Sequence, residues 1–205
     1  MLSPAWPETV AAAGHGYGDG CVVDSILTNY ADALGQDLQG YRNHIHRVLA
    51  FYRALSDPTT HAGDDAADGG APPMAVLIAA AFHDIGIWTD QTFDYLEPSA
   101  ARAQRYLQQR GLDAELGPQV HALIVHHHKL RPFHADTPWA ASVERWRRAD
   151  LIDVSLGVIR FGLPRATVRG IQQRYPDAGF HRRLAALTLR QFCRTPWRPL
   201  PMLHW

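Results

Sequence analysis

The sequence has few of the features that mark secreted or membrane-spanning proteins. Its 205 residues include only two cysteines, Cys21 and Cys193, which are far apart in the chain. This scarcity excludes a disulfide framework and a CxxC metal knuckle, and it suits a reducing compartment. The longest apolar run, Met74 to Phe82, is nine residues long, which is too short to span a bilayer.

The sequence also lacks an excess of charge of either sign. Lys and Arg together number 20, as do Asp and Glu, so the formal net charge is zero. A neutral chain does not favour a nucleic-acid polymer or an anionic membrane as a partner. Residues 1–10 show neither a basic start nor an apolar run of signal-peptide length. We therefore expect a cytoplasmic protein whose partner is a small molecule, and its oligomeric state stays open.

No strand-like alternation of apolar and polar residues is found, whereas apolar spacing typical of helices recurs along the chain. The sequence predicts an all-α fold, a single helical-bundle domain of about seven to nine helices over residues 1–205. Segment 56–73 is rich in Asp, Gly and Pro and predicts an exposed loop, and 195–205 predicts an irregular tail. The expected helices cover about 22–34, 38–55, 74–85, 100–111, 114–128, 138–158, 164–175 and 180–192.

Histidine, by contrast, is abundant, with 12 residues, and it is the commonest metal ligand in proteins. His83 and Asp84 directly follow the run 74–82. A helix that is apolar on every side is buried, so this pair is expected in or near the core. A buried carboxylate needs a partner or a metal ion. The alternative is a capping aspartate beside a core histidine.

Two further segments place histidines on the inner faces of helices. His44 adjoins the apolar stripe of its helix and is expected to point inward, whereas His46 lies on the polar face. His127 lies at the centre of the inner face of a later helix, with His126 and His128 on either side. The alternatives are a hydrogen-bonded core histidine at 44 and a solvated histidine cluster at the end of the later helix.

Asp150 lies on the apolar stripe of the helix predicted at 138–158, and Asp153 lies on a neighbouring face. Asp150 is expected to point inward, either to a metal ion or to a buried salt bridge with Arg47 or Arg147. Helical bundles build metal sites from side chains on facing helices. Taken together, the four segments predict such a site.

The order of these motifs resembles the HD-domain superfamily of metal-dependent phosphohydrolases, whose signature is H…HD…D. The matching residues are His44 in NHIHRV, His83-Asp84 in FHDIGIW and Asp150 in RWRRAD, and the resemblance covers about 37–162. It implies a helical fold of the HD type in which His44, His83, Asp84 and Asp150 hold a metal ion.

Some members of that superfamily bind a second metal ion, and the resemblance implies His126, His127 and Glu97 as its candidate ligands. Glu97 stands where those members place a histidine before a proline, and its alternative role is that of an acidic residue at a helix N-terminus. The chain lacks the GYP motif of cyclic-dinucleotide phosphodiesterases and has Ile87 where they often have lysine. The expected cofactor is one or two divalent transition metal ions: Mn, Fe, Co, Ni or Zn.

The function implied is hydrolysis of a small phosphorylated or nucleotide-like ester by metal-activated water. Asp153 or an unligated histidine is the expected general acid, and basic residues near the site are candidates for binding phosphate, although solvated loop charges are the alternative. The candidate catalytic residues are Asp84, His127 and Asp153, and the candidate substrate-binding residues are Lys129, Arg131 and Arg47.

Two other functions stay open. Some HD-type proteins are di-iron oxygenases that cleave a carbon bond with O₂, a hypothesis that weakens if Glu97 is not a ligand. The other alternative is a metal-binding sensor module without turnover.

Overall fold

The computed structural model describes residues 19–55, 72–198 and 200–203. Regular structure in these residues is entirely helical, which confirms the predicted all-α class, and the count of longer helices agrees with the expected seven to nine. Most of the loop predicted at 56–73 lies outside the described residues. Two four-residue helices, α3 (Ala31–Leu34) and α6 (Gly86–Thr89), and a 3₁₀ turn, Gly35–Asp37, join the longer ones. The helices of nine or more residues are α2 (Asp19–Thr28), α4 (Leu38–Ala54), α5 (Met74–Phe82), α7 (Leu96–Gln108), α8 (Asp113–His126), α9 (Ala140–Val154), α10 (Arg165–Arg174) and α11 (Phe180–Arg194).

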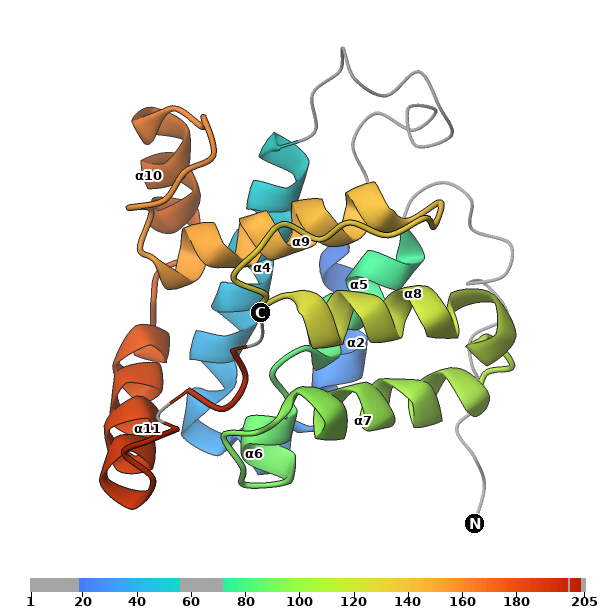
Figure 1. Cartoon of the computed structure of the whole chain (residues 1–205), viewed down its shortest axis with the longest axis horizontal. Coiled ribbons are helices and arrows are strands. Elements are labelled where there is room, and N and C mark those ends of the chain that lie inside the picture. Colours follow the sequence, from blue (N-terminus) through green and yellow to red (C-terminus); the bar gives the residue numbers. More distant parts are fainter. Residues whose placement is uncertain (1–18, 56–71, 199, 204–205) are drawn as a thin grey trace.

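Helix α5 forms the centre of the bundle and packs against α2, α4, α7 and α8 (Figure 1). Every residue from Ala75 to Phe82 is buried, as expected for a helix that is apolar all round. The chain turns at the end of α5, and His83 caps its C-terminus. The His83-Asp84 pair is therefore delivered to the interior by the helix that precedes it.

Helix α4 lies against α5 and α9 on one side and against α10 and α11 on another. This second contact corrects the prediction that His46 points outward. His46 is buried, and its ring stacks on Tyr175 at the end of α10 with centroids 5.3 Å apart. The polar face of α4 is covered because α10 packs back over it, which the periodicity of α4 alone cannot reveal.

Some helix ends also differ from the prediction. The helix expected over 22–34 is broken between α2 and α3, where Thr28 and Asn29 donate side-chain hydrogen bonds to the carbonyls of Asp24 and Ser25. Such local bonds compete with helix continuation. The described residues of the tail, 195–198 and 200–203, form turns. No helix in the described part of the chain has the length and apolar character needed to cross a membrane.

Candidate metal centre

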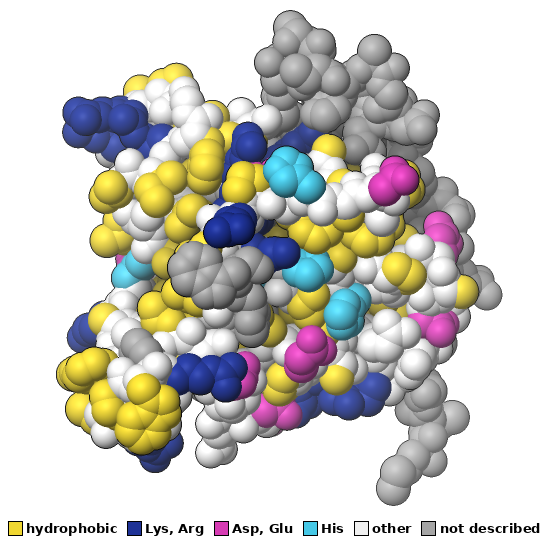
Figure 2. All heavy atoms as spheres, viewed as in Figure 1, with side chains coloured by type: hydrophobic (Ala, Val, Ile, Leu, Met, Phe, Trp, Pro, Cys, Tyr) yellow, Lys and Arg dark blue, Asp and Glu magenta, His cyan; other side chains and the backbone are white. Residues whose placement is uncertain are grey.

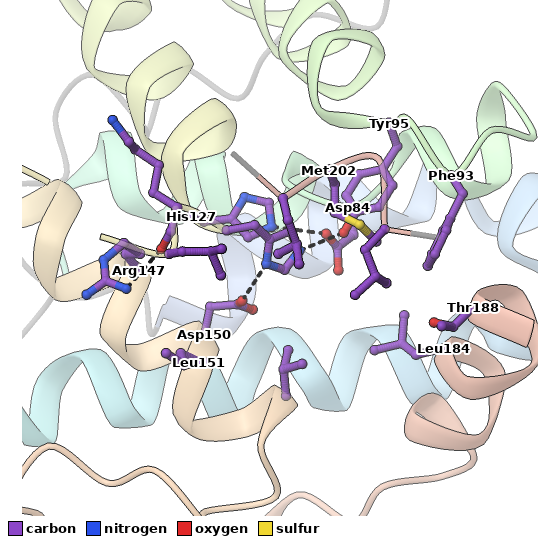
Figure 3. Close-up of a pocket in the computed structure, with 16 residues that line it drawn as sticks. Asp84, Phe93, Tyr95, His127, Arg147, Asp150, Leu151, Leu184, Thr188 and Met202 are labelled. Atoms are coloured by element: carbon purple, nitrogen blue, oxygen red, sulfur yellow. Dashed lines mark hydrogen bonds and ion pairs between the residues drawn. The ribbon is translucent and has the colours of Figure 1, made fainter. Parts of the chain in front are cut away.

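Four helices deliver histidine and aspartate side chains to one buried cluster. His44 comes from the middle of α4, Asp150 from α9, His83-Asp84 from the turn after α5, and His127 from the turn after α8. Each of these five side chains is at most 3% exposed. The structure thus brings together the four predicted ligands of the first metal ion and one of those predicted for a second. Figure 3 shows Asp84, His127 and Asp150 of this cluster.

The first ligand set consists of Nε2 of His44, Nε2 of His83 and one oxygen each from Asp84 and Asp150. The two nitrogens are 3.0 Å apart. Asp84 Oδ2 lies 3.7 Å from His44 Nε2 and 3.4 Å from His83 Nε2, and Asp150 Oδ1 lies 3.5 and 4.0 Å from the same atoms. Ligand atoms about 2.1 Å from an ion are separated by roughly 3.0–3.4 Å. These four atoms therefore fit one transition metal ion after small adjustments.

A second ligand set uses the other oxygens of the same two carboxylates. Asp84 Oδ1 lies 3.4 Å from His127 Nε2, and Asp150 Oδ2 lies 3.5 Å from Nδ1 of His128. His127, His128 and Asp150 offer three ligand atoms close enough to share an ion. Asp84 and Asp150 each present one oxygen to each set, so both can bridge two ions.

Backbone carbonyls set the orientation of two of the histidines. Nδ1 of His83 donates to the carbonyl of Ala80 at 2.8 Å, and Nδ1 of His127 donates to the carbonyl of Ile124 at 2.6 Å. A carbonyl cannot donate, so Nδ1 carries the proton in both rings and Nε2 is directed into the cluster. Burial lowers the pKa of His83 to about 3. Its ring is therefore neutral, with a lone pair at Nε2.

Asp153 orients His44 in the same way. Its Oδ2 accepts a hydrogen bond from His44 Nδ1 at 2.7 Å, and Arg47 donates to both of its oxygens at 2.6 and 2.8 Å. Burial opposes ionisation of Asp153, but these donors outweigh it and lower the pKa to about 2. Nε2 of His44 and Nε2 of His83 face each other across 3.0 Å, close enough to share a cation. Metal-binding histidines are held by outer partners of this kind.

Unpartnered polar atoms gather at the same place. Among the described residues, Asp84 Oδ1, His127 Nε2 and both oxygens of Asp150 are buried without a hydrogen-bond partner. Buried polar atoms are nearly always paired, and an unpaired buried carboxylate is costly. The donor set therefore fits a divalent transition metal ion, which prefers this mixture of imidazole and carboxylate.

The pKa shifts reflect this crowding of charge. Burial raises the pKa of Asp150 to about 6, and the nearby carboxylates Asp84 and Asp153 add to the rise. Burial would also raise the pKa of Asp84, but His83 and His127 hold it below its ordinary range. Burial lowers the pKa of His127, but Asp84 and Asp150 outweigh this and raise it overall. His127 Nε2 is therefore an atom at which a proton competes with a metal ion.

Two residues assigned to the second ion lie outside the cluster, which corrects those assignments. The Glu97 side chain is 78% exposed on the first turn of α7, 3.6 Å from His121. The ring of His126 packs on Phe133 with centroids 4.8 Å apart. Helix α8 ends at His126, and the turn that follows directs His127 and His128 to the cluster instead.

The structure also revises part of the predicted catalytic and substrate-binding set. Asp153 and Arg47 are paired with each other behind His44, and neither lines the cavity beside the cluster. Asp153 is therefore not placed to act as a general acid on a substrate in that cavity. Lys129 does line the cavity. Arg131 is exposed and is not part of the lining.

Two residues of the site were not assigned a role from the sequence: His128, whose role as a ligand stayed open, and Tyr95. The hydroxyl of Tyr95 lies 2.7 Å from His128 Nε2, and Tyr95 is 1% exposed. The helical period could not place His128, because it stands two residues beyond the end of α8. Tyr95 could not be assigned from the sequence, because no local pattern distinguishes a buried tyrosine at a site from one in a core.

Comparisons with protein-family models, curated proteins and solved structures find no match to this chain. The all-helical fold and its buried His/Asp cluster are compatible with an HD-type protein.

Proposed function

We propose that this chain is a metal-dependent hydrolase of the HD type that acts on a small phosphate ester. The observation that carries the proposal is the position of the unpartnered cluster atoms. Asp84, His127 and Asp150 form part of the wall of a cavity of about 220 Å³. A structural metal site is closed, whereas a catalytic site keeps a position open to water or substrate. Because these cluster residues border a cavity, the site favours an enzyme over a sensor module.

The chain offers ligands for one or two ions of Mn, Fe, Co, Ni or Zn. A bound ion would lower the pKa of a water molecule and draw charge from a phosphoryl oxygen. His44 and His83 would hold one ion, and His127 and His128 would hold a second. The oxygens of Asp84 and Asp150 would be shared between the two sets. Each oxygen lies 3.4 or 3.5 Å from its nearest histidine nitrogen.

Other residues of this chain orient the ligands and bind the substrate. Tyr95 holds the ring of His128 through its hydroxyl, and burial raises the pKa of Tyr95 well above its ordinary value, so the hydroxyl keeps its proton. Lys129 can pair with a phosphoryl oxygen from the cavity wall. Asp153 acts behind the site as the residue that orients His44, which replaces its predicted role as general acid.

A di-iron oxygenase is the second candidate. That hypothesis is weakened because Glu97 lies outside the cluster with an exposed side chain. His127 and His128 nevertheless supply a second ligand set. The identity of the bound metal therefore separates the two chemistries, and we favour hydrolysis.

Elemental analysis of protein purified without chelator tests the proposal, combined with hydrolysis of p-nitrophenyl phosphate after loading with Mn²⁺. We expect one or two transition metal ions per chain and turnover in the wild type, and loss of both in His83→Ala and Asp150→Ala. His121→Ala is the matched control, because that histidine is half exposed outside the cluster. A wild type that cannot be loaded to a defined stoichiometry would refute the proposal. Stoichiometric iron with O₂ consumption would replace it with the oxygenase.

A further inference from the structure

The wall of the cavity beside the cluster is mostly apolar. Its polar lining includes the cluster residues Asp84, His127, His128 and Asp150. The rest of the wall comes from several elements that are far apart in the sequence, so it is not the core face of a single helix (Figure 3). Its apolar residues include Leu130, Leu151, Val154, Leu184, Leu200 and Met202.

Helix α11 and the chain after it complete the apolar part. Leu184 and Thr188 of α11 lie across the cavity from Asp150 of α9 (Figure 3). Met202 belongs to the final described segment, 200–203, and is buried. Just before that segment, Arg198 lies 3.5 Å from Asp94, so an ion pair holds this part of the chain near the wall.

Positive charge is scarce in the same cavity. Its described cationic side chains are Lys129, the only lysine of the chain, and Arg147. Arg147 is neutralised by Glu144, to which it donates at 2.7 and 2.8 Å, and it also donates to the Lys129 carbonyl at 3.1 Å. A nucleoside diphosphate or triphosphate spreads its charge over several phosphates and needs several cations. Apart from ions held by the cluster, the described cavity wall offers a phosphate only Lys129 and the already neutralised Arg147, which is too few cations for a nucleotide.

We propose that the ligand of this cavity is a compact phosphate monoester whose other group is apolar, such as a short aliphatic or aromatic alcohol, rather than a nucleotide. The proposal rests on the proposed hydrolase function for the reaction. The phosphoryl group would face Asp84, His127 and Asp150, and the apolar group would lie against Leu184 and Met202. A cavity of about 220 Å³ is smaller than the roughly 300–1,000 Å³ that encloses drug-sized ligands.

Hydrolysis of such an ester is balanced by water alone. The bond between phosphorus and the ester oxygen breaks, the hydroxyl of water joins phosphorus, and the water proton goes to the leaving oxygen. The products are inorganic phosphate and a small apolar alcohol. Burial of the apolar group would contribute binding in proportion to the area removed from water.

Two phosphonates that cannot be hydrolysed at phosphorus test the ligand class separately from the reaction. Binding of phenylphosphonate and of methylphosphonate to the full chain loaded with Mn²⁺ is measured by isothermal titration calorimetry. We expect phenylphosphonate to bind about tenfold more tightly or better. Leu184→Gln should reduce this ratio toward one, whereas Thr188→Val, which is nearly isosteric, should preserve or increase it.

Leu189→Gln is the matched control on the same helix. Leu189 is 64% exposed on α11. Hydrophobic side chains gather at the lower left of Figure 2, where Figure 1 shows α11. Leu189→Gln should leave the binding ratio unchanged. Circular dichroism checks that each variant is folded. If Leu184→Gln does not fold, Thr188→Val still tests the proposal, because a lower binding ratio in that variant would contradict it.

Equal affinity for the two phosphonates, binding of neither, or tighter binding of ADP than of phenylphosphonate would each overturn the proposal. The preference for the phenyl group without any esterase activity would refute the hydrolase function and retain the ligand class. Turnover of phosphate esters without a preference for the phenyl group would retain the hydrolase function and refute the ligand class.

Discussion

Asp153 shows how a residue outside the cavity can control a ligand inside the cluster. Its carboxylate accepts from His44 Nδ1 and also from Nε and Nη2 of Arg47. Outer partners of this kind fix the tautomer of a metal-binding histidine and increase its basicity. Asp153 also neutralises a guanidinium that is 2% exposed. Asp153 therefore supports the proposed metal site and also stabilises the fold.

We predict that Asp153→Asn weakens Mn²⁺ binding by about 10–100-fold. It should also lower the free energy of unfolding by about 3 kcal/mol, because Arg47 is left buried without a carboxylate. The double variant Arg47→Met/Asp153→Asn removes that charge, so it should recover stability but not affinity. Calorimetric titration and urea unfolding measure the two effects. Unchanged Mn²⁺ affinity in Asp153→Asn would rule out the orienting role.

Glu144 joins the loop after α8 to α9 beside the cavity. It accepts from Arg147, from Arg148 at 2.7 Å and from the backbone N–H of Phe133 at 2.8 Å. Burial raises its pKa, but these donors outweigh burial and lower the pKa from 4.5 to about 2. Because the folded-state pKa is the lower one, the stabilisation is complete above about pH 4.5 and is lost as the pH falls toward 2.

Glu144→Gln should therefore lower the free energy of unfolding by about 2 kcal/mol at neutral pH. The difference from the wild type should shrink as the pH falls below about 4.5, since the wild-type carboxylate becomes protonated. Urea unfolding of both proteins over a pH series measures it. A difference that stays constant down to about pH 3 would show that the charge of Glu144 is not what stabilises this loop.

At the scale of elements, the close approach of α6 to the start of α7 positions Tyr95. Gly86 begins α6, and its N–H donates to Ser99 Oγ at 3.0 Å. A Cβ atom at Gly86 would lie 2.9 Å from the Tyr95 carbonyl oxygen and 3.2 Å from Pro98 Cβ. The glycine is needed here because two backbones meet with no room for a side chain.

Gly86→Ala should destabilise the protein by about 1–3 kcal/mol, because it forces α6 and α7 apart. Gly170→Ala is the matched control: Gly170 lies within α10, and a Cβ there meets nothing within 4 Å. The control should stabilise by about 0.5–1 kcal/mol through helix propensity. Urea unfolding measures the free energy of unfolding of both variants. Equal effects of the two substitutions would show that the contact between α6 and α7 is not tight.

For the whole molecule, metal removal should reveal how strongly the cluster is coupled to folding. An ion that binds only the folded chain stabilises it by about 2.7 kcal/mol at 100 times its Kd. For a chain of this size we expect Mn²⁺ to raise Tm by roughly 5–10 °C. Chelation should reverse the rise. A thermal scan in which Mn²⁺ has no effect would contradict a site built into the core.

Asp150→Asn tests the same coupling between metal binding and folding by removing the buried charge that the ion would neutralise. Both oxygens of Asp150 are buried without a partner among the described residues, so the chelated wild type bears the cost of that carboxylate. The variant should have a chelated Tm equal to or above that of the wild type and should lose the Mn²⁺ shift. A lower chelated Tm would mean that the carboxylate stabilises the fold without metal.

The sequence by itself determined the helical class and the inward direction of the main ligands. Both follow from local periodicity, because a side chain on the apolar stripe of a helix must face the core. His44 and Asp150 adjoin or lie on such stripes, and the pair His83-Asp84 follows a helix that is apolar all round. Periodicity was sufficient to predict that these side chains point inward, and the resemblance to the HD-domain superfamily selected them as four candidate ligands of one metal ion.

Only the tertiary structure decided which neighbouring residues join that site. His46 is buried because α10 packs over α4, and Asp153 rather than Asp150 pairs with Arg47 because α4 and α9 meet at that register. His128 replaces His126 because the helical period stops at the end of α8. The apolar cavity wall needs α9, α11 and residues 200–203 together. Contacts between distant segments create these features, and no local pattern encodes which segments meet.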